Sequence, residues 1–298
     1  MNYNQPPKIK GLEEKEYSSK IALHFFRHGE KESQEGIDDK EIRLTPAGRI
    51  KAMAKIRPLT ISQAVAFGSS RKRTQETALL AMTGVQPEIT GEETFEELRE
   101  KIEKDLKVGK KIGTEEKLDF PEDPTTEYHK LTQEHYRKGD LLKFLVEESD
   151  DLAKKYNDKK TYTYSRSARQ IAELIKKYLK IAPRWNELAE DKSKKYGDTL
   201  ERFMGTHQTI PESFLAKVIE KTEGKEEKDN FVKLLDNKGF DYVEGFDLEI
   251  LNTKDGPKIK IHYENKKGLP APVGKEKPFT FDEYIKPELL DEIIKEGK

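Results

Sequence analysis

An apolar run that ends in Arg-His-Gly constrains this sequence more than any other stretch. Residues 21–26 (IALHFF) combine apolar, β-branched and aromatic side chains, which predicts a buried strand. Arg27, His28 and Gly29 follow at once, so a cation, an imidazole and a flexible backbone point stand at the strand's carboxyl end. Open α/β sheets carry their chemistry at this end of their strands. The stretch therefore favours an α/β fold with a polar site at the strand ends.

Two later segments repeat this pattern of a strand that ends in polar residues. Residues 64–68 lead into Ser69, and a basic helix start that contains Arg73 follows directly. Residues 203–206 lead into His207. Free N–H groups at a helix N-terminus attract anions, and guanidinium groups match phosphate oxygens in a bidentate way. Because such strand ends meet at one edge of a sheet, we predict a pocket for a phosphate-like dianion.

An imidazole in a pocket of this kind has chemistry of its own. When it is held neutral, it is a nucleophile that can accept a phosphoryl group. The oxygen that leaves then needs a proton, so we expect a carboxylic acid nearby. We expect no metal site, because His24 and His28 lie four residues apart in a β-type run and not on a helix, with a cation between them.

The remaining patterns predict a three-layer α/β domain with a mainly parallel central sheet over residues 21–264. A helical insertion at about 104–160 is expected to form a cap over the site, and a β-hairpin is expected near the C-terminal end of the domain. We expect the substrate to be selected by this insertion and by the loop after Glu30. The segments outside the domain are an N-terminal leader and a C-terminal tail with a short helix, residues 1–20 and 265–298.

Composition excludes several classes of function. With 56 Lys and Arg against 57 Asp and Glu, the formal net charge of −1 lacks the footprint of a nucleic-acid binder. The absence of cysteine excludes disulfides and thiolate chemistry. No segment is long and apolar enough to span a membrane, and the polar N-terminus does not resemble a signal peptide. We therefore expect a cytoplasmic protein without nucleic-acid or membrane partners, and no pattern specifies its oligomeric state.

Five motifs occur in one order along the chain. They are Arg27-His28-Gly29-Glu30, Leu44-Thr45-Pro46-x-Gly48, Ser69 four residues before Arg73, Leu98-Arg99-Glu100, and His207 after a strand. This ordered set resembles the histidine phosphatase superfamily, the phosphoglycerate-mutase-like clan. The resemblance implies a metal-independent phosphomonoesterase that works without a cofactor through a phosphohistidine. Its substrate would be a phosphorylated small molecule or phosphoprotein.

The resemblance also implies roles for individual residues. His28 would be the nucleophile, and Ser69 would support the phosphate site. Glu100 would protonate the leaving oxygen and then activate water, with Glu97 as the second choice. The groups that hold the phosphoryl would be Arg27, Arg73 and His207, the last of them also catalytic.

Two alternatives stay open at this point. The segment after Glu30 lacks the Ser, spacer and Trp-Asn continuation of the mutases, which favours a phosphatase. A phosphomutase or phosphotransferase of the same clan is the first alternative. A catalytically poor module that binds phosphorylated ligands is the second.

Overall fold

The computed structural model describes residues 16–33, 35–55, 64–84, 89–90, 92–105, 112–191, 197–265 and 279–298. Most of the expected N-terminal leader lies outside these residues. The strands are β1 (Ser19–Arg27), β2 (Val65–Gly68), β3 (Ile112–Thr114), β4 (Thr199–Thr206), β5 (Gly245–Thr253), β6 (Gly256–Asn265) and β7 (Phe279–Ile285). The helices are α1 (Pro46–Met53), α2 (Lys72–Thr83), α3 (Phe95–Asp105), the 3₁₀ turn η2 (Glu116–Leu118), α4 (Glu127–Lys138), α5 (Leu141–Lys155), α6 (Tyr164–Glu190), α7 (Ile210–Thr222), α8 (Lys225–Leu234) and α9 (Pro287–Glu296).

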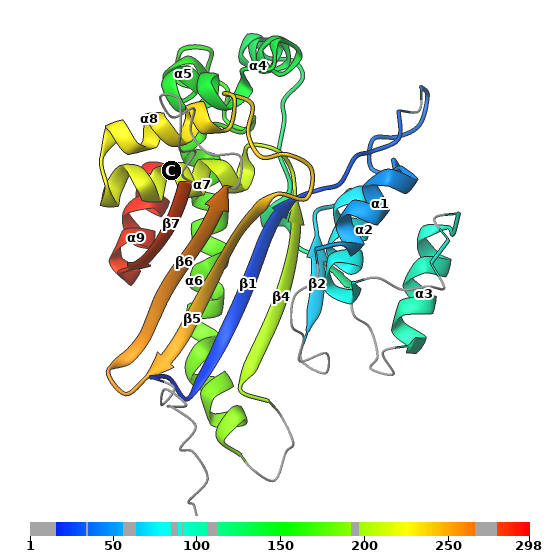
Figure 1. Ribbon diagram of the computed structural model, residues 1–298. Coiled ribbons are helices and arrows are strands. Elements are labelled where there is room, and N and C mark those ends of the chain that lie inside the picture. The colour runs from blue at the N-terminus through cyan, green and yellow to red at the C-terminus, as the bar shows by residue number, and fades with distance from the viewer. Residues whose placement is uncertain are drawn as a thin grey trace, which may run out of the picture.

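The seven strands form one mixed sheet in the order β3-β2-β4-β1-β5-β6-β7 (Figure 1). The first four strands in this order pair in parallel. Each of the other three, β5, β6 and β7, is antiparallel to the strand before it in the order. The register pairs Arg27 with Thr206, so β1 and β4 end side by side. The expected fold class, an α/β sandwich with a parallel centre and a C-terminal hairpin, is therefore confirmed.

Helices cover the sheet in two layers because β1 alternates its apolar side chains. Leu23 and Phe25 are fully buried in the cluster that contains α6 and α7, and Phe26 is fully buried in the cluster that contains α2. Burial of each phenylalanine side chain contributes about 1.5–3 kcal/mol to stability. At Gly205 of β4, a Cβ atom would overlap the carbonyl oxygen of Thr74, so only glycine lets α2 approach this strand end.

The C-terminal segment is more than a tail with a short helix. The helix is present as α9, and its Leu290 and Ile293 are fully buried. In addition, residues 279–285 form β7, which pairs with β6 from Phe279 to Ile285. This strand was not predicted, and it packs here because β6 would otherwise leave an open sheet edge.

The insertion begins within the sheet and then rises above it. β3 adds a strand beside β2, and α4 and α5 stand beyond the carboxyl ends of β1 and β4 (Figure 1). We call residues 119–163 the cap. Thr126 begins α4 by accepting the N–H of His129 at 3.0 Å, and Gly139 ends it in the left-handed conformation.

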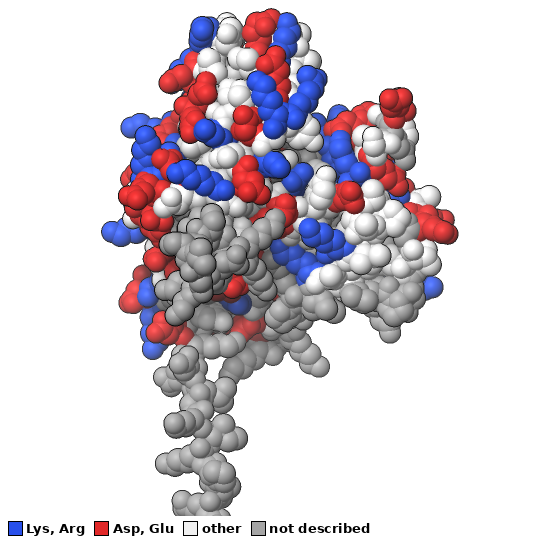
Figure 2. Space-filling view, turned by 45° about the horizontal axis from the view of Figure 1, so that its top comes forward, with Lys and Arg blue, Asp and Glu red and all other residues white. Residues whose placement is uncertain are grey.

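The described surface carries both signs of charge. Acidic and basic side chains are interspersed over the face in Figure 2. In the described part of the chain, every helix falls short of the length or the apolar character needed to cross a membrane.

Candidate active site

The ends of β1 and β4 bring two histidines together in a cavity of about 240 Å³. His28 follows β1 and His207 follows β4, and their ring centroids lie 5.4 Å apart. The N–H of His28 donates to the carbonyl of Thr206 at 2.9 Å, which fixes one strand end against the other. Arg27 and Arg73 also line this cavity. Four of the residues that we singled out in the sequence thus converge on one place.

The hydrogen bond of the His28 ring determines which nitrogen is free. Nδ1 lies 2.7 Å from the carbonyl oxygen of Gly29, and a carbonyl only accepts, so Nδ1 carries the proton. Nε2 therefore keeps its lone pair. Burial, and after it the charge of Arg73, lowers the pKa of His28 to about 3. At neutral pH this residue is an uncharged imidazole with one nucleophilic nitrogen.

His207 lies in a polar contact chain that begins on α2. Its Nε2 is 2.8 Å from Ser69 Oγ, and Ser69 Oγ is 3.0 Å from Thr74 Oγ1. The ring of Phe120 meets His207 edge-on with a centroid distance of 4.5 Å. Burial, and after it the neighbouring His28, lowers the pKa of His207 well below its usual value. Ser69 thus contacts His207. It is not one of the described residues that line the cavity.

The two arginines of the cavity are held by neighbouring groups. Arg27 donates to the carbonyl of Phe240 at 2.6 Å, and its guanidinium lies 4.3 Å from the centroid of the Tyr242 ring. Arg73 donates to the carbonyl of Asp39 at 2.7 Å and to its carboxylate at 3.0 Å. Both guanidinium groups are therefore preorganised beside His28.

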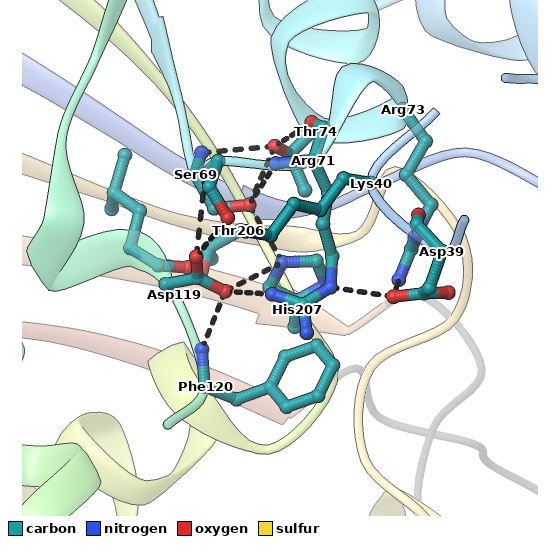
Figure 3. A network of polar contacts seen from close by, with 12 residues as sticks. Asp39, Lys40, Ser69, Arg71, Arg73, Thr74, Asp119, Phe120, Thr206 and His207 are labelled. Atoms are coloured by element: carbon teal, nitrogen blue, oxygen red, sulfur yellow. Dashed lines mark hydrogen bonds and ion pairs between the residues drawn. The ribbon is translucent and has the colours of Figure 1, made fainter. Parts of the chain in front are cut away.

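Asp39 binds a second arginine as well, which the sequence did not lead us to expect. Its carboxylate accepts from Nε of Arg71 at 2.6 Å and from Arg73, as Figure 3 shows. These two arginines hold the pKa of the Asp39 carboxyl well below its usual range, against the opposing effect of partial burial. A carboxylate from the loop after His28 thus already occupies guanidinium groups that an incoming phosphate would need.

Arg71 also reaches across the site to Asp119. It forms an ion pair with that carboxylate, and its guanidinium lies 3.8 Å from the centroid of the Phe120 ring (Figure 3). Asp119 accepts further from the Ser70 hydroxyl at 2.5 Å and from the Phe120 N–H at 2.9 Å. With these donors around it, Asp119 anchors the start of the cap to α2.

The structure does not bring Glu100 or Glu97 to this cavity, contrary to the place that we expected for the proton donor. Both lie on α3, where Leu98 and Ile102 are buried and turn the glutamates to the other side. Glu97 accepts the backbone N–H of Thr94 at the start of its own helix. Glu97 and Glu100 border a separate surface hollow, and Figure 1 shows α3 apart from the strand ends.

A different carboxyl group, Glu122, lines the cavity with the histidines. It is half-buried, and burial raises its pKa, while the nearby His129 opposes this effect. Its position in the sequence could have indicated Glu122 as a site residue. Glu122 comes after β3, a further parallel strand of the sheet, and is separated from it by η2 and Pro121.

Comparisons with known proteins identify a family for part of the chain. Residues 23–136 match the family model described as histidine phosphatase superfamily (branch 1). No curated protein matches the sequence. A solved mycobacterial glucosyl-3-phosphoglycerate phosphatase is similar at 11% identity, with 82% of this chain and 96% of that chain covered and a TM-score of 0.41. A phosphoserine phosphatase from Entamoeba histolytica is similar at 15% identity, with 80% and 93% covered and a TM-score of 0.34.

Proposed function

We propose that this chain, which belongs to the histidine phosphatase superfamily through residues 23–136, is a phosphomonoesterase that works through a phosphohistidine at His28. One observation carries the proposal. The imidazole of His28 is neutral, its Nε2 keeps its lone pair, and it lies in one cavity with Arg27, Arg73 and His207. This set matches the needs of phosphoryl transfer, which are a nucleophile and fixed positive charge around the transferring group.

The reaction has two halves. In the first, His28 Nε2 attacks phosphorus, the bond to the leaving oxygen breaks, and that oxygen takes a proton. In the second, a water molecule gives up a proton, its oxygen attacks the phosphohistidine, and the N–P bond breaks. Inorganic phosphate leaves, and His28 is neutral again. Arg27, Arg73 and His207 would stabilise the charge that develops on the phosphoryl oxygens.

Glu122 replaces Glu100 as our proposed proton donor and base. A general acid has to be protonated part of the time near neutral pH, and burial raises the pKa of Glu122 in that direction. Asp119 is the runner-up because it contacts the same region. Its carboxylate, however, is paired with Arg71 and accepts three further hydrogen bonds, from the N–H and hydroxyl of Ser70 and the N–H of Phe120.

Phosphate release by a matched set of variants tests the proposal. The wild-type protein should release inorganic phosphate from 4-nitrophenyl phosphate, and His28→Ala should abolish the release. His262→Ala is the control, because His262 is an exposed histidine on β6 outside the cavity. Undiminished hydrolysis by His28→Ala would overturn the mechanism. Transfer to an added alcohol without phosphate release would point to a phosphotransferase, and binding without turnover to a binding module.

A further inference from the structure

We infer that the esters hydrolysed at this site carry an uncharged aromatic leaving group, which the cap holds against the catalytic histidines. The inference rests on the proposed function, because it concerns the part of the substrate beside the phosphoryl group. Its starting point is that four aromatic side chains line the same cavity as His28: Phe120, Tyr136, Tyr162 and Tyr242.

Three of these rings belong to the cap. Phe120 and Tyr162 stand near its two ends, and Tyr136 lies on α4. Gln133 also lines the cavity and lies one helical turn before Tyr136, so one face of α4 is turned toward the site. The insertion therefore supplies most of the wall opposite the phosphate-binding groups.

The rings begin directly beside the reacting atoms. Phe120 packs edge-on against His207, with centroids 4.5 Å apart, and Tyr242 lies 6.2 Å from the ring of His28. An aromatic group bonded to the ester oxygen is only two bonds from phosphorus, so it would meet these rings at once. Offset and edge-on ring pairs add about 0.5–1.5 kcal/mol each to the burial of apolar area.

The wall formed by the cap is held in place. Phe120 meets Tyr162 edge-on at 5.9 Å and 81°. The Tyr162 N–H donates to the carbonyl of Pro121 at 3.0 Å, and the Tyr162 carbonyl accepts the hydroxyl of Tyr128 at 2.9 Å. Preorganised rings lose little conformational freedom when a ligand binds, so their contacts count fully toward affinity.

The charges of the cavity argue against an acidic leaving group. The cations among its described lining residues are Arg27, Lys31 and Arg73, and the last two are paired with Asp39 at the phosphate end. The cap contributes Glu122 and Gln133, which are hydrogen-bonded to each other at 3.2 Å. A carboxylate or second phosphate placed there would lose its hydration and find no cation among the described cap residues that line the cavity.

The size of the cavity is compatible with one aromatic ring beside the phosphate. Its volume is about 240 Å³, and a second hollow adjoins it at Arg27, Tyr136 and Tyr242. The substrate class that we infer is thus a small aryl phosphate.

The test measures binding and not rate, because aryl oxides are better leaving groups in any phosphatase. Isothermal titration calorimetry compares phenylphosphonate with cyclohexylphosphonate, which has the same carbon count and charge but no π-face. Two further ligands, 3-phosphonopropionate and a hexose phosphonate, represent acidic and sugar leaving groups. We expect phenylphosphonate to bind about three- to tenfold more tightly than each of the other three.

Variants locate the preference. Tyr136→Leu and Tyr242→Leu should each reduce the phenyl-to-cyclohexyl ratio by about threefold, whereas Tyr284→Leu, an exposed tyrosine on β7, should leave it unchanged. Equal or tighter binding of cyclohexyl-, hexose- or propionate-phosphonate by the wild type would overturn the inference. The two proposals can fail separately, because hydrolysis without aryl preference refutes only this one, and aryl preference without hydrolysis refutes only the proposed function.

Discussion

The carboxylate of Asp39 occupies the arginines that should bind phosphate, and its removal is the sharpest perturbation of the site. Asp39→Asn keeps the shape of the side chain and removes its charge. The carboxylate bridges Arg71 and Arg73, and a phosphoryl group needs the same N–H donors. We expect the variant to bind inorganic phosphate more tightly than the wild type, because a neutral amide competes poorly for a guanidinium.

The expected size of the effect follows from the exposure of the partners. The Arg73 side chain is 3% exposed, but that of Asp39 is 44% exposed, so solvent screens the pair and its strength must be discounted. A doubly paired carboxylate in this setting is worth about 1–2 kcal/mol. If phosphate has to displace it, the apparent dissociation constant rises by the corresponding factor, about 5- to 30-fold. Asp39→Asn should recover most of this factor.

Calorimetric titration with inorganic phosphate at pH 7 measures the change directly. Asp38→Asn is a matched control, because Asp38 precedes Asp39 in the same loop, is exposed, and its carboxylate accepts the backbone N–H of Lys40. The control should change the affinity by less than about twofold. Equal or weaker phosphate binding by Asp39→Asn would refute the reasoning, and weaker binding would mean that Asp39 orients the arginines for the ligand.

Three further predictions concern catalysis and stability. Glu122→Gln should lower the hydrolysis of alkyl phosphates by about 10²–10⁴-fold in steady-state assays, with a smaller loss on 4-nitrophenyl phosphate, whereas Glu100→Gln should leave both rates unchanged. Glu76→Gln should cost about 3–5 kcal/mol in urea unfolding, because this fully buried carboxylate pairs with two arginines; Glu127→Gln, at an exposed pair, should cost under about 0.5 kcal/mol. The pKa of His28 is about 3 in the folded state and about 6.5 when unfolded, so the unfolded state binds the extra proton between these values. His28 should therefore contribute up to about 1.4 kcal/mol per pH unit to the loss of stability as pH drops from 6.5 to 3, and His28→Asn should remove this part of the slope.

The fold and the phosphate end of the site can be predicted from the sequence because local patterns encode them. The strand that ends in Arg27 and His28 places these side chains at its own terminus, and the strand before His207 does the same. Parallel pairing then brings the ends together without any information from elsewhere in the chain. The same holds for α1, where Thr45 caps the helix by accepting the N–H of Gly48 at 3.0 Å.

The proton donor and the internal competitor depend on tertiary packing, which such patterns do not contain. Glu100 follows a plausible motif, but burial of Leu98 against the core turns it away from the cavity. Glu122 becomes a site residue only because the cap returns over the strand ends. Asp39 lies in a polar loop, and its role appears only when that loop folds back onto α2 and Arg73. Contacts of this kind join residues far apart in the chain, so local sequence patterns do not predict them.

The most direct test of the account is to identify the phosphorylated residue during turnover. Rapid quenching into alkali, followed by mass spectrometry of peptides, should find a phosphoryl group on His28. It should be attached at Nε2, because Nδ1 is bound to the carbonyl of Gly29. Phosphate release without any phosphohistidine, or a phosphoryl group on His207 in place of His28, would contradict the central claim.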